Sequence, residues 1–214
     1  MPGVGAVVVA AGRGDRFGAP KQFVAVAGAR LVDWAVDACR AACDHVVVVL
    51  PAGTPWDGPP VHAAVAGGAT RSDSVRAGLG ALPPDVDVVV VHDAARPLAG
   101  AELFTAVIGA VRAGADGAVP GVRVTDTLKR VDGTRVVETI DRSAVVAVQT
   151  PQAFRAATLR AAHATGGEAT DDAALVEAAG GVVVVVPGEP ANVKVTDATD
   201  LERVRATLAT EVGR

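Results

Sequence analysis

Short runs in which every residue is apolar recur along the chain and alternate with longer amphipathic segments. The apolar runs lie at about 5–10, 46–50, 87–91 and 182–186, and the amphipathic segments lie near 31–42, 71–81, 100–113 and 197–211. Runs that are apolar at every position, and not at alternate ones, are typical of strands covered on both faces. The pattern therefore predicts an α/β fold with a doubly wound, mostly parallel sheet between layers of helices.

Between about residues 122 and 146 the pattern changes to charged and β-branched residues. Asp132-Gly133, in the middle of this segment, is a turn signal for a β-hairpin, so we expect a protruding β arm. An arm with so few apolar side chains cannot form a core of its own and should lie against another surface, most simply a second copy of the chain. The segment therefore predicts a homodimer.

The composition is that of a folded chain whose core consists of small aliphatic side chains. Half of the 214 residues are hydrophobic and 3% are aromatic, and this length is within the range of one α/β domain. The apolar runs are far shorter than the roughly 20 residues that span a bilayer. No basic residue precedes the first apolar run, and no small-residue cleavage site follows it. We expect a single domain over 1–214, no membrane segment and a cytoplasmic location.

Charge and cysteine spacing argue against two further classes of protein. A formal net charge of −4 disfavours broad binding to nucleic acid, although a local basic pocket for an anionic ligand remains compatible with it. Cys39 and Cys43 have neither CxxC nor CxxH spacing, so the sequence predicts buried thiols and not a zinc site or a disulfide scaffold. We therefore expect no nucleic-acid partner.

A glycine-rich segment from Ala10 to Gly18 follows the first predicted strand, where an open α/β sheet carries its ligand-binding loops. It is not a dinucleotide fingerprint, because Phe17 occupies the position of the third glycine, and it is not a Walker loop, because a proline precedes Lys21. Arg13, Arg16 and Lys21 form a cationic group of the kind that holds a triphosphate. The same residues could also form a solvated loop with incidental charges.

His92 and Asp93 follow the strand predicted at 87–91, so Asp93 faces the same edge of the sheet as the glycine-rich segment. A carboxylate in this place can bind Mg²⁺ that also contacts substrate phosphates. His92 could be a ligand or a base, but a histidine packed beside the sheet is the commoner outcome, and we assign it no chemistry. Thr170-Asp171-Asp172 could hold a metal, but a threonine followed by acids is typical of a helix start, which is the interpretation we keep.

Six motifs follow one another between residues 10 and 201, namely AAGRGDRFGAPKQF, GGATRSDSVRAGL, HDAARP, VTDTLKR, DRSAVVAVQTPQAF and NVKVTDATDL. Together and in this order they resemble the 2-C-methyl-D-erythritol 4-phosphate cytidylyltransferase family. The resemblance implies a Rossmann-like nucleotidyltransferase fold, a homodimer that exchanges its β arms, and a requirement for Mg²⁺. It implies that CTP and 2-C-methyl-D-erythritol 4-phosphate are converted to 4-CDP-2-C-methyl-D-erythritol and pyrophosphate in non-mevalonate isoprenoid precursor biosynthesis.

The resemblance also implies roles for residues that match the family's nucleotide site. The matching positions are Ala10, Ala11, Gly12, Arg16, Lys21, Gly67, Gly68, Ser74, Asp93 and Lys194. Arg16, Lys21 and Lys194 would be catalytic, with both lysines at the reacting phosphate. The loop that carries Ser74 would receive the base, although Ser74 could instead cap or pack in a helix. Asp93 would lie beside the ribose, the acceptor and the metal.

Two residues of the arm match positions that hold the acceptor's phosphate in the neighbouring subunit's site. They are Thr127 and Arg142. Each has a structural alternative, because Thr127 could be an ordinary strand residue and Arg142 could pair with Asp141. Ala69 departs from the family pattern, since some relatives have Asp there, and we assign it no side-chain contact.

Three other functions compete with this interpretation. A ribitol 5-phosphate cytidylyltransferase would share the fold, CTP and most site residues, but HDAARP, DTLKR and the AAG opening favour the methylerythritol enzyme. A nicotinamide-dependent oxidoreductase is disfavoured by Phe17 and by Leu50, where an acid should end the second strand. A non-catalytic nucleotide-binding module would have no reason to keep Lys21, Asp93 and Lys194 together.

Overall fold

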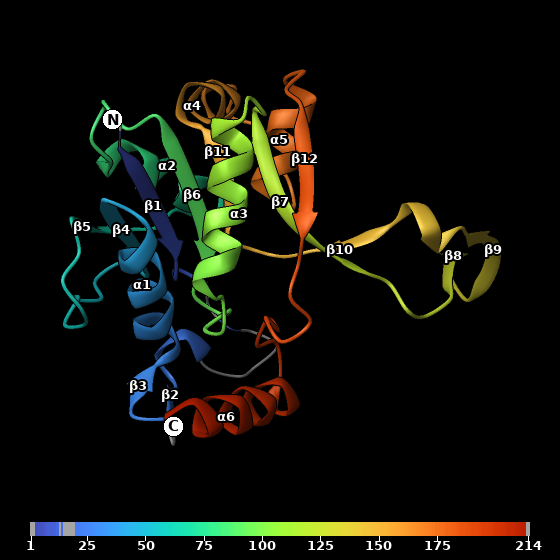
Figure 1. The fold of residues 1–214 in the computed structure, drawn as a ribbon, viewed down its shortest axis with the longest axis horizontal. Helices are drawn as coiled ribbons and strands as arrows, with labels where there is room; N and C mark the ends of the chain where they lie inside the picture. Colours follow the sequence, from blue (N-terminus) through green and yellow to red (C-terminus); the bar gives the residue numbers. More distant parts are fainter. Residues whose placement is uncertain (1–2, 13, 15–19, 213–214) are drawn as a thin grey trace.

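The computed structural model describes residues 3–12, 14 and 20–212 of the chain, and a mostly parallel sheet forms its centre (Figure 1). In spatial order the strands are β10 (Val146–Val148), β7 (Gly117–Arg123), β11 (Gln152–Arg155), β6 (Val88–Asp93), β1 (Val4–Val9), β4 (His45–Leu50) and β5 (Ala63–Ala66), and β12 (Val183–Pro187) also pairs with β7. The pairs β1–β4, β1–β6, β4–β5 and β7–β12 are parallel, whereas β11 and β10 run antiparallel to their neighbours. The predicted α/β fold is confirmed.

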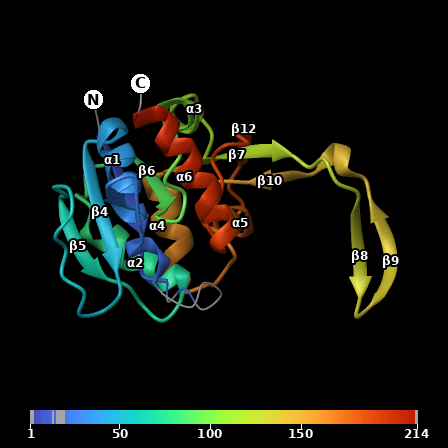
Figure 2. The ribbon, with the colours of Figure 1, turned by 90° about the horizontal axis from the view of Figure 1, so that it is seen from below.

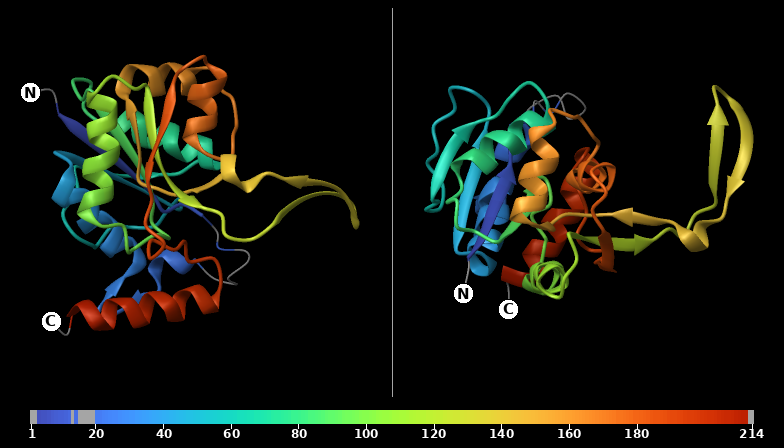
Figure 3. Two further views of the ribbon diagram at one scale, coloured as in Figure 1. Left: turned by 45° about the vertical axis from the view of Figure 1, so that its right-hand side comes forward. Right: turned by 90° about the horizontal axis from the view of Figure 1, so that it is seen from above.

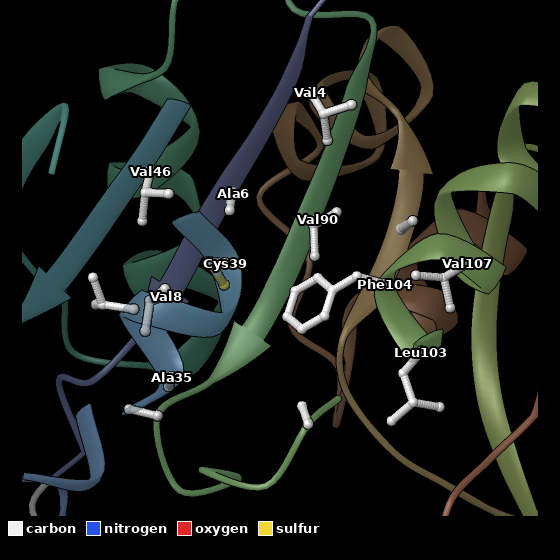
Figure 4. Close-up of a cluster of buried hydrophobic side chains, with 14 of the residues drawn as sticks. Val4, Ala6, Val8, Ala35, Cys39, Val46, Val90, Leu103, Phe104 and Val107 are labelled. Carbon is white, nitrogen blue, oxygen red and sulfur yellow. The ribbon is translucent and has the colours of Figure 1, made fainter. Parts of the chain in front are cut away.

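Helices cover both faces of this sheet, which explains why its strands are apolar at every position. On one face lie α1 (Leu31–Ala42) and α3 (Ala101–Arg112), and on the other lie α2 (Arg71–Ala81), α4 (Ala156–Ala164) and α5 (Asp172–Ala178). Along β1, Ala6 and Val8 pack toward α1 and α3, while Val7 packs toward α2. Figure 4 shows the first of these layers, in which Phe104 of α3 lies over the strands.

A smaller apolar cluster joins the C-terminal helix to the start of the chain. It lies between α6 (Ala198–Val212), the short hairpin of β2 (Ala25–Val26) and β3 (Ala29–Arg30), and the beginning of α1. Val204 and Leu208 of α6 pack there against Val26 and Leu31. This cluster holds the segment that precedes α6 close to the carboxyl edge of the sheet, where it contributes to the site described below. Among the described residues, no helix combines the length and apolar character needed to cross a membrane.

The segment after β7 leaves the body of the molecule and forms the predicted β arm (Figures 2 and 3). β8 (Leu128–Asp132) and β9 (Arg135–Ile140) pair as an antiparallel hairpin, and the short 3-10 helix η2 (Arg142–Ala144) leads back to β10. The turn contains Gly133 in a left-handed conformation, with φ of 55°, which glycine adopts without steric cost. Val131, Val136 and Val137 are more than half exposed on the arm.

Candidate active site

A cleft of about 630 Å³ lies at the carboxyl ends of β1 and β6, where open α/β sheets bind their ligands. Its lining comes from the loop after β1, the 3-10 helix η1 (Lys21–Phe23), the start of α2, the end of β6 and the segment before α6. The lining includes eight predicted residues, namely Ala10, Ala11, Gly12, Lys21, Gly68, Ser74, Asp93 and Lys194. Motifs that lie far apart in the sequence therefore meet in one place. The predicted catalytic Arg16 lies outside the described residues.

The loop after β1 is held in place by a glutamine that sequence reasoning did not identify. Gln22 is buried, and its side-chain amide donates hydrogen bonds to the carbonyl oxygens of Ala10 at 2.8 Å and Gly12 at 2.9 Å. Ala10 in turn donates its backbone N–H to the carbonyl of Val49 at 2.8 Å. Because Gln22 directly follows Lys21, these contacts also fix the point at which Lys21 enters the cleft wall.

Gly67 and Gly68 are positions where the structure leaves no room for a side chain. A Cβ on Gly67 would overlap the Cβ of Ala11 and lie 2.7 Å from the Oγ of Ser74, and one on Gly68 would overlap the Cβ of Asp73. Glycine at both positions lets the segment after β5 approach the loop after β1 closely. Gly68 lines the cleft, whereas Gly67 packs directly behind it.

The N-terminus of α2 faces the cleft and is capped by side chains of the helix start itself. Thr70 and Asp73 form a reciprocal capping box, because each accepts the backbone N–H of the other at 3.1 Å. The hydroxyl of Ser74 donates to the carbonyl of Thr70 at 3.0 Å. Ser74 therefore has the helix-packing role that was its structural alternative, while its oxygen keeps acceptor capacity on the cleft side. The first turn of α2 also gives the cleft a positive electrostatic potential that favours anions.

Asp93 is the carboxylate at the centre of the cleft, and cations flank both of its oxygens. Its Oδ2 lies 2.5 Å from Nζ of Lys194, and its Oδ1 lies 3.5 Å from Nη2 of Arg71. Burial by itself would raise the pKa of Asp93, but Lys194 and Arg71 outweigh burial and hold that pKa well below its ordinary value. Asp93 is therefore ionised at neutral pH.

The backbone at Asp93 is fixed by two buried side chains. Its N–H donates to Oγ1 of Thr150 at 3.0 Å, and Oγ1 lies 3.1 Å from Nδ1 of His92. The other ring nitrogen of His92, Nε2, lies 3.1 Å from the carbonyl of Arg96, which can only accept, so Nε2 carries the proton and Nδ1 accepts from Thr150. Burial lowers the pKa of His92 to about 4. His92 is thus a neutral, buried residue that packs within the sheet layer, as expected from the sequence.

Arg71 is a second residue of the cleft that sequence reasoning missed. It is the first residue of α2, and its Nη1 forms a 2.8 Å ion pair with Oδ2 of Asp172. Asp172 begins α5, and Asp171 caps that helix by accepting the N–H of Ala174 at 3.0 Å, so the predicted helix start is confirmed. Burial alone would lower the pKa of Arg71, but Asp172 and Asp93 raise it above its ordinary value. The only sequence signal for Arg71 was its place in the GGATR motif.

Lys194 is presented by a segment that is anchored to the sheet on both sides of it. Val195 donates its N–H to the carbonyl of Ala95 at 2.8 Å. Asn192 is fully buried and donates its side-chain amide to the carbonyl of Thr150 at 2.9 Å, while its own carbonyl accepts from Arg96 at 2.7 Å. These contacts place Nζ of Lys194 over Asp93 although the segment has no regular secondary structure.

The two predicted acceptor residues lie on the arm and not in the cleft of their own chain. Thr127 is exposed just before β8, and Arg142 is exposed in η2, where its guanidinium donates to the carbonyl of Thr125. Asp141 accepts the N–H of Ser143 at 2.9 Å and so caps η2. Among the described residues, the lining of the cleft includes no residue of the arm, which extends from the body of the molecule (Figure 3). A role of the arm in the cleft of a neighbouring subunit stays a prediction.

Comparisons with known proteins agree on one family. Residues 4–210 match the family model described as 2-C-methyl-D-erythritol 4-phosphate cytidylyltransferase. A protein of that name from Nocardia farcinica is 48% identical over 214 residues, which covers 95% of this chain and 92% of the relative. A bifunctional enzyme IspD/IspF from Clavibacter michiganensis is 48% identical over 229 residues, and the chain spans 56% of its length and is itself covered to 99%.

A solved structure with a related name has the same fold. The crystal structure of 2-C-methyl-D-erythritol 4-phosphate cytidylyltransferase from Thermus thermophilus aligns with a TM-score of 0.82 and 37% sequence identity. The alignment covers 95% of this chain and 98% of the other. The likeness therefore extends over nearly the whole of both chains.

Proposed function

The chain belongs to the 2-C-methyl-D-erythritol 4-phosphate cytidylyltransferase family, and we propose that it carries out the reaction of that family in the cleft at the carboxyl edge of its sheet. It is a nucleotidyltransferase that joins the cytidylyl group of CTP to 2-C-methyl-D-erythritol 4-phosphate and releases pyrophosphate, in isoprenoid biosynthesis. The observation that carries this conclusion is the gathering of Lys21, Asp93 and Lys194 around one cleft by a chain that matches the family along residues 4–210.

CTP occupies the cleft with its triphosphate toward the cations. The loop of Ala10, Ala11 and Gly12, together with Lys21 and Arg16, receives the triphosphate, and the first turn of α2 adds backbone N–H groups and a favourable dipole. Cytosine lies against the segment of Gly67, Gly68 and Ser74, and the ribose lies beside Asp93. Support for this arrangement comes from the close approach of Gly67 to Ala11, which brings the two loops together.

The chemistry requires positioning and charge stabilisation and does not require a protein base. A phosphate monoester has a second pKa of about 6 and is largely dianionic at neutral pH, so the acceptor supplies its own nucleophile. As its oxygen attacks the α-phosphorus in line, negative charge grows on the α-phosphate oxygens. Lys21 and Lys194 stabilise that charge in a preorganised site. His92 is buried and neutral, which fits a mechanism without a histidine base.

The cleft could bind Mg²⁺ if most of the ligands of the ion came from the substrate. Asp93 is the one carboxylate among the described residues that line the cleft, and Mg²⁺ usually binds one or two carboxylates together with substrate phosphates and water. The described residues contain no group of three or more His, Cys, Asp or Glu residues that could hold a metal by themselves. Asp93 and the phosphates would hold the ion, which supplies positive charge to the transferring group.

The acceptor's phosphate is held by Thr127 and Arg142 of a second subunit. Both residues are exposed on an arm that extends away from the cleft of its own chain, and Val131, Val136 and Val137 leave apolar surface on that arm for another chain to cover. A homodimer with exchanged arms accounts for both features. The chain forms one domain over residues 1–214, and the enzyme works in the cytoplasm.

Pyrophosphate release with a panel of substrates tests this function. Each of ATP, GTP, UTP and CTP is offered with 2-C-methyl-D-erythritol 4-phosphate and, separately, with ribitol 5-phosphate, and reactions without acceptor give the background. We expect the largest kcat/KM for CTP with the methylerythritol acceptor. Comparable turnover with ribitol 5-phosphate would move the assignment to the rival cytidylyltransferase, and release without acceptor would indicate a nucleotide hydrolase.

A further inference from the structure

A chain of charged and polar side chains runs from the cleft into the layer formed by α4 and α5. From the cleft inward, Nη2 of Arg71 lies 3.5 Å from Asp93, and Nη1 of Arg71 lies 2.8 Å from Oδ2 of Asp172. Oδ1 of Asp172 then lies 2.9 Å from Nε2 of His163 on α4. Asp172 and His163 are fully buried and do not line the cleft. Among the described residues, Arg71 is therefore the side chain that links them to the cleft.

The position of Asp172 is costly unless its carboxylate has a specific task. It is 0% exposed, and a buried carboxylate is tolerated only when its oxygens are paired. Capping α5 does not account for it, because the neighbouring Asp171 already accepts the N–H of Ala174. Both oxygens of Asp172 are used instead by Arg71 and His163.

Arg71 also occupies a position that needs an explanation. It is the first residue of α2, where the helix dipole disfavours a cation. The ionised Asp172 offsets that cost and fixes one edge of the planar guanidinium, and the remaining edge faces Asp93. A lysine could not serve both carboxylates in this way, because its ammonium is a single point charge on a flexible stem.

We propose that Asp172, supported by His163, is a positioning residue that holds Arg71 in the cleft wall, and that Arg71 so held keeps Asp93 in place for the nucleotide. The proposal rests on the proposed function and deepens it, since it adds the α4–α5 layer to the site. It separates the two neighbouring acids at the start of α5 by role. Asp171 caps the helix and accepts from the buried Gln152 at 3.0 Å, whereas Asp172 serves the cleft.

The test compares Asp172→Asn with its neighbour Asp171→Asn. Asparagine caps helices as well as aspartate does, so Asp171→Asn keeps the cap while it removes one negative charge near Arg71 and alters the contact with Gln152. Gln152 is not among the described residues that line the cleft, and the ion pair between Arg71 and Asp172 is kept, so kcat/KM should stay near the wild-type value. Asp172→Asn keeps the shape but loses the ion pair with Arg71. We expect kcat/KM for CTP to fall about 10- to 100-fold, mainly because KM rises. The size is taken from metal sites, where the loss of a side chain that orients a ligand has a similar effect. Thermal unfolding of both variants reports whether the fold is kept, and equal kcat/KM in both would overturn the proposal.

A double-mutant cycle shows whether Asp172 acts through Arg71. The cycle contains Asp172→Asn, Arg71→Gln and the combined variant. If Asp172 works only by holding Arg71, adding Asp172→Asn to Arg71→Gln should change kcat/KM less than about twofold. Independent, multiplying losses would contradict the proposal. Arg71→Lys, at a side chain that is 25% exposed, remains informative if Asp172→Asn does not fold, because wild-type kcat/KM in that variant would also overturn the proposal.

CTP binding to the same variants, measured by calorimetry, tests the positioning role of Asp172 separately from the proposed function. We expect the dissociation constant for CTP to rise in Asp172→Asn and Arg71→Lys and to stay unchanged in Asp171→Asn. Wild-type protein that binds CTP but transfers nothing to the methylerythritol acceptor would contradict the proposed function while the binding comparison still decides the role of Asp172. Unchanged CTP affinity in Asp172→Asn and Arg71→Lys would contradict the positioning role itself.

Discussion

Lys194 and Asp93 meet at 2.5 Å although about a hundred positions separate them in the sequence. The two partners differ in burial, because the side chain of Lys194 is 40% exposed whereas that of Asp93 is 11% exposed. A half-exposed ammonium contributes little net stability to a fold. In the proposed reaction the same ammonium would lie beside the transferring phosphate, where a preorganised charge contributes much more to catalysis.

We therefore expect Lys194→Ala and Lys21→Ala to lower kcat by about 10²- to 10³-fold, by analogy with the loss of one preorganised oxyanion donor. Thermal unfolding should change little in Lys194→Ala, because Asp93 retains Arg71 as a cationic neighbour. We expect the same of Lys21→Ala, since Lys21 is partly exposed in the cleft wall. Steady-state kinetics and melting curves of the same preparations measure both effects. Arg40→Ala removes an exposed cation on α1 and serves as the control. A lysine variant that keeps normal kcat, or that is inactive only because it unfolds, would remove that lysine from the mechanism.

Sequence motifs identified some residues of the cleft and could not identify others. Lys21 and Asp93 were found from their places after predicted strands, and Lys194 was found only from the resemblance to a family. The structure brings all three to one cleft. Gln22 and Arg71 differ because their importance depends on partners that only the tertiary structure supplies, namely the carbonyls of the β1 loop and a buried acid on α5. A glutamine or an arginine next to a motif has no periodic signal of its own.

The neutral state of His92 leads to a pH-dependent stability that can be measured. Burial lowers the pKa of His92 to about 4 in the folded protein, whereas an unfolded histidine has its ordinary value near 6.5. Above that ordinary value both states are neutral. As the pH falls below it, the unfolded chain takes up a proton that the folded chain does not, so folding stability is lost down to the folded pKa.

His92→Gln should therefore reduce the pH dependence of stability. Between pH 7 and pH 5 the wild type should lose about 2 kcal/mol more of its free energy of unfolding than the variant loses, because only the wild type carries this group. Urea unfolding curves at several pH values provide the measurement, and the comparison cancels the acids common to both proteins. Parallel curves for the two proteins would show that His92 titrates normally in the folded state.

The cleft depends on how closely its loops approach, as Gly67 illustrates. The Cβ of Ala11 is fixed to the backbone and cannot rotate away, so a side chain at Gly67 must push the segment after β5 and the loop after β1 apart. Gly80 in α2 is the matched control, because a Cβ at that position meets no described atom within 4 Å apart from its chain neighbours and the nearby backbone of its own helix. Alanine should therefore have opposite effects on stability at these two positions.

We expect Gly67→Ala to destabilise the protein by about 1 to 3 kcal/mol through overpacking. A displacement near 1 Å at the nucleotide site can also lower kcat/KM by about 10²-fold. Gly80→Ala should instead stabilise α2 by roughly 0.5 to 1 kcal/mol, because glycine inside a helix carries an entropic cost, and activity should be unchanged. Chemical denaturation and kinetics of the two variants test the pair. Full activity in Gly67→Ala would show that the close approach is not needed for the reaction.

Elements with a clear local sequence pattern were predicted, whereas elements that depend on their neighbours in the fold were not. β1, β4, β6 and β12 lie where continuous apolar runs were found, and α1, α2, α3 and α6 lie within a few residues of the amphipathic segments. β5, β7, β10, β11 and α4 were missed. β5 and β11 have only four residues each, and β7 contains a proline and two glycines, which interrupt a strand pattern. β11 also contains Gln152, which is buried by its place between β6 and β7. A buried polar strand position of this kind is determined by neighbours and not by local pattern.

The arm raises a question about the whole molecule, because Thr127 and Arg142 lie on a hairpin that extends away from the cleft of their own chain (Figures 2 and 3). If Arg142 serves a partner's cleft, an Asp93→Ala chain still donates an intact arm, and an Arg142→Ala chain still offers an intact cleft. Each pure variant is inactive, since every site lacks one of the two residues. A mixed dimer has one site in which both are present.

Dissociating and reassociating the Asp93→Ala and Arg142→Ala proteins together should therefore restore activity, up to about a quarter of the wild-type value for random pairing of two chains in a closed dimer. Native mass spectrometry verifies that subunits have exchanged. Asp93→Ala mixed with Lys194→Ala is the matched control, because both changes damage the cleft and no combination of arms can repair it. Were Arg142 to act within its own chain, every site of every mixed dimer would lack Asp93 or Arg142, and exchange without rescue would refute the swapped arms.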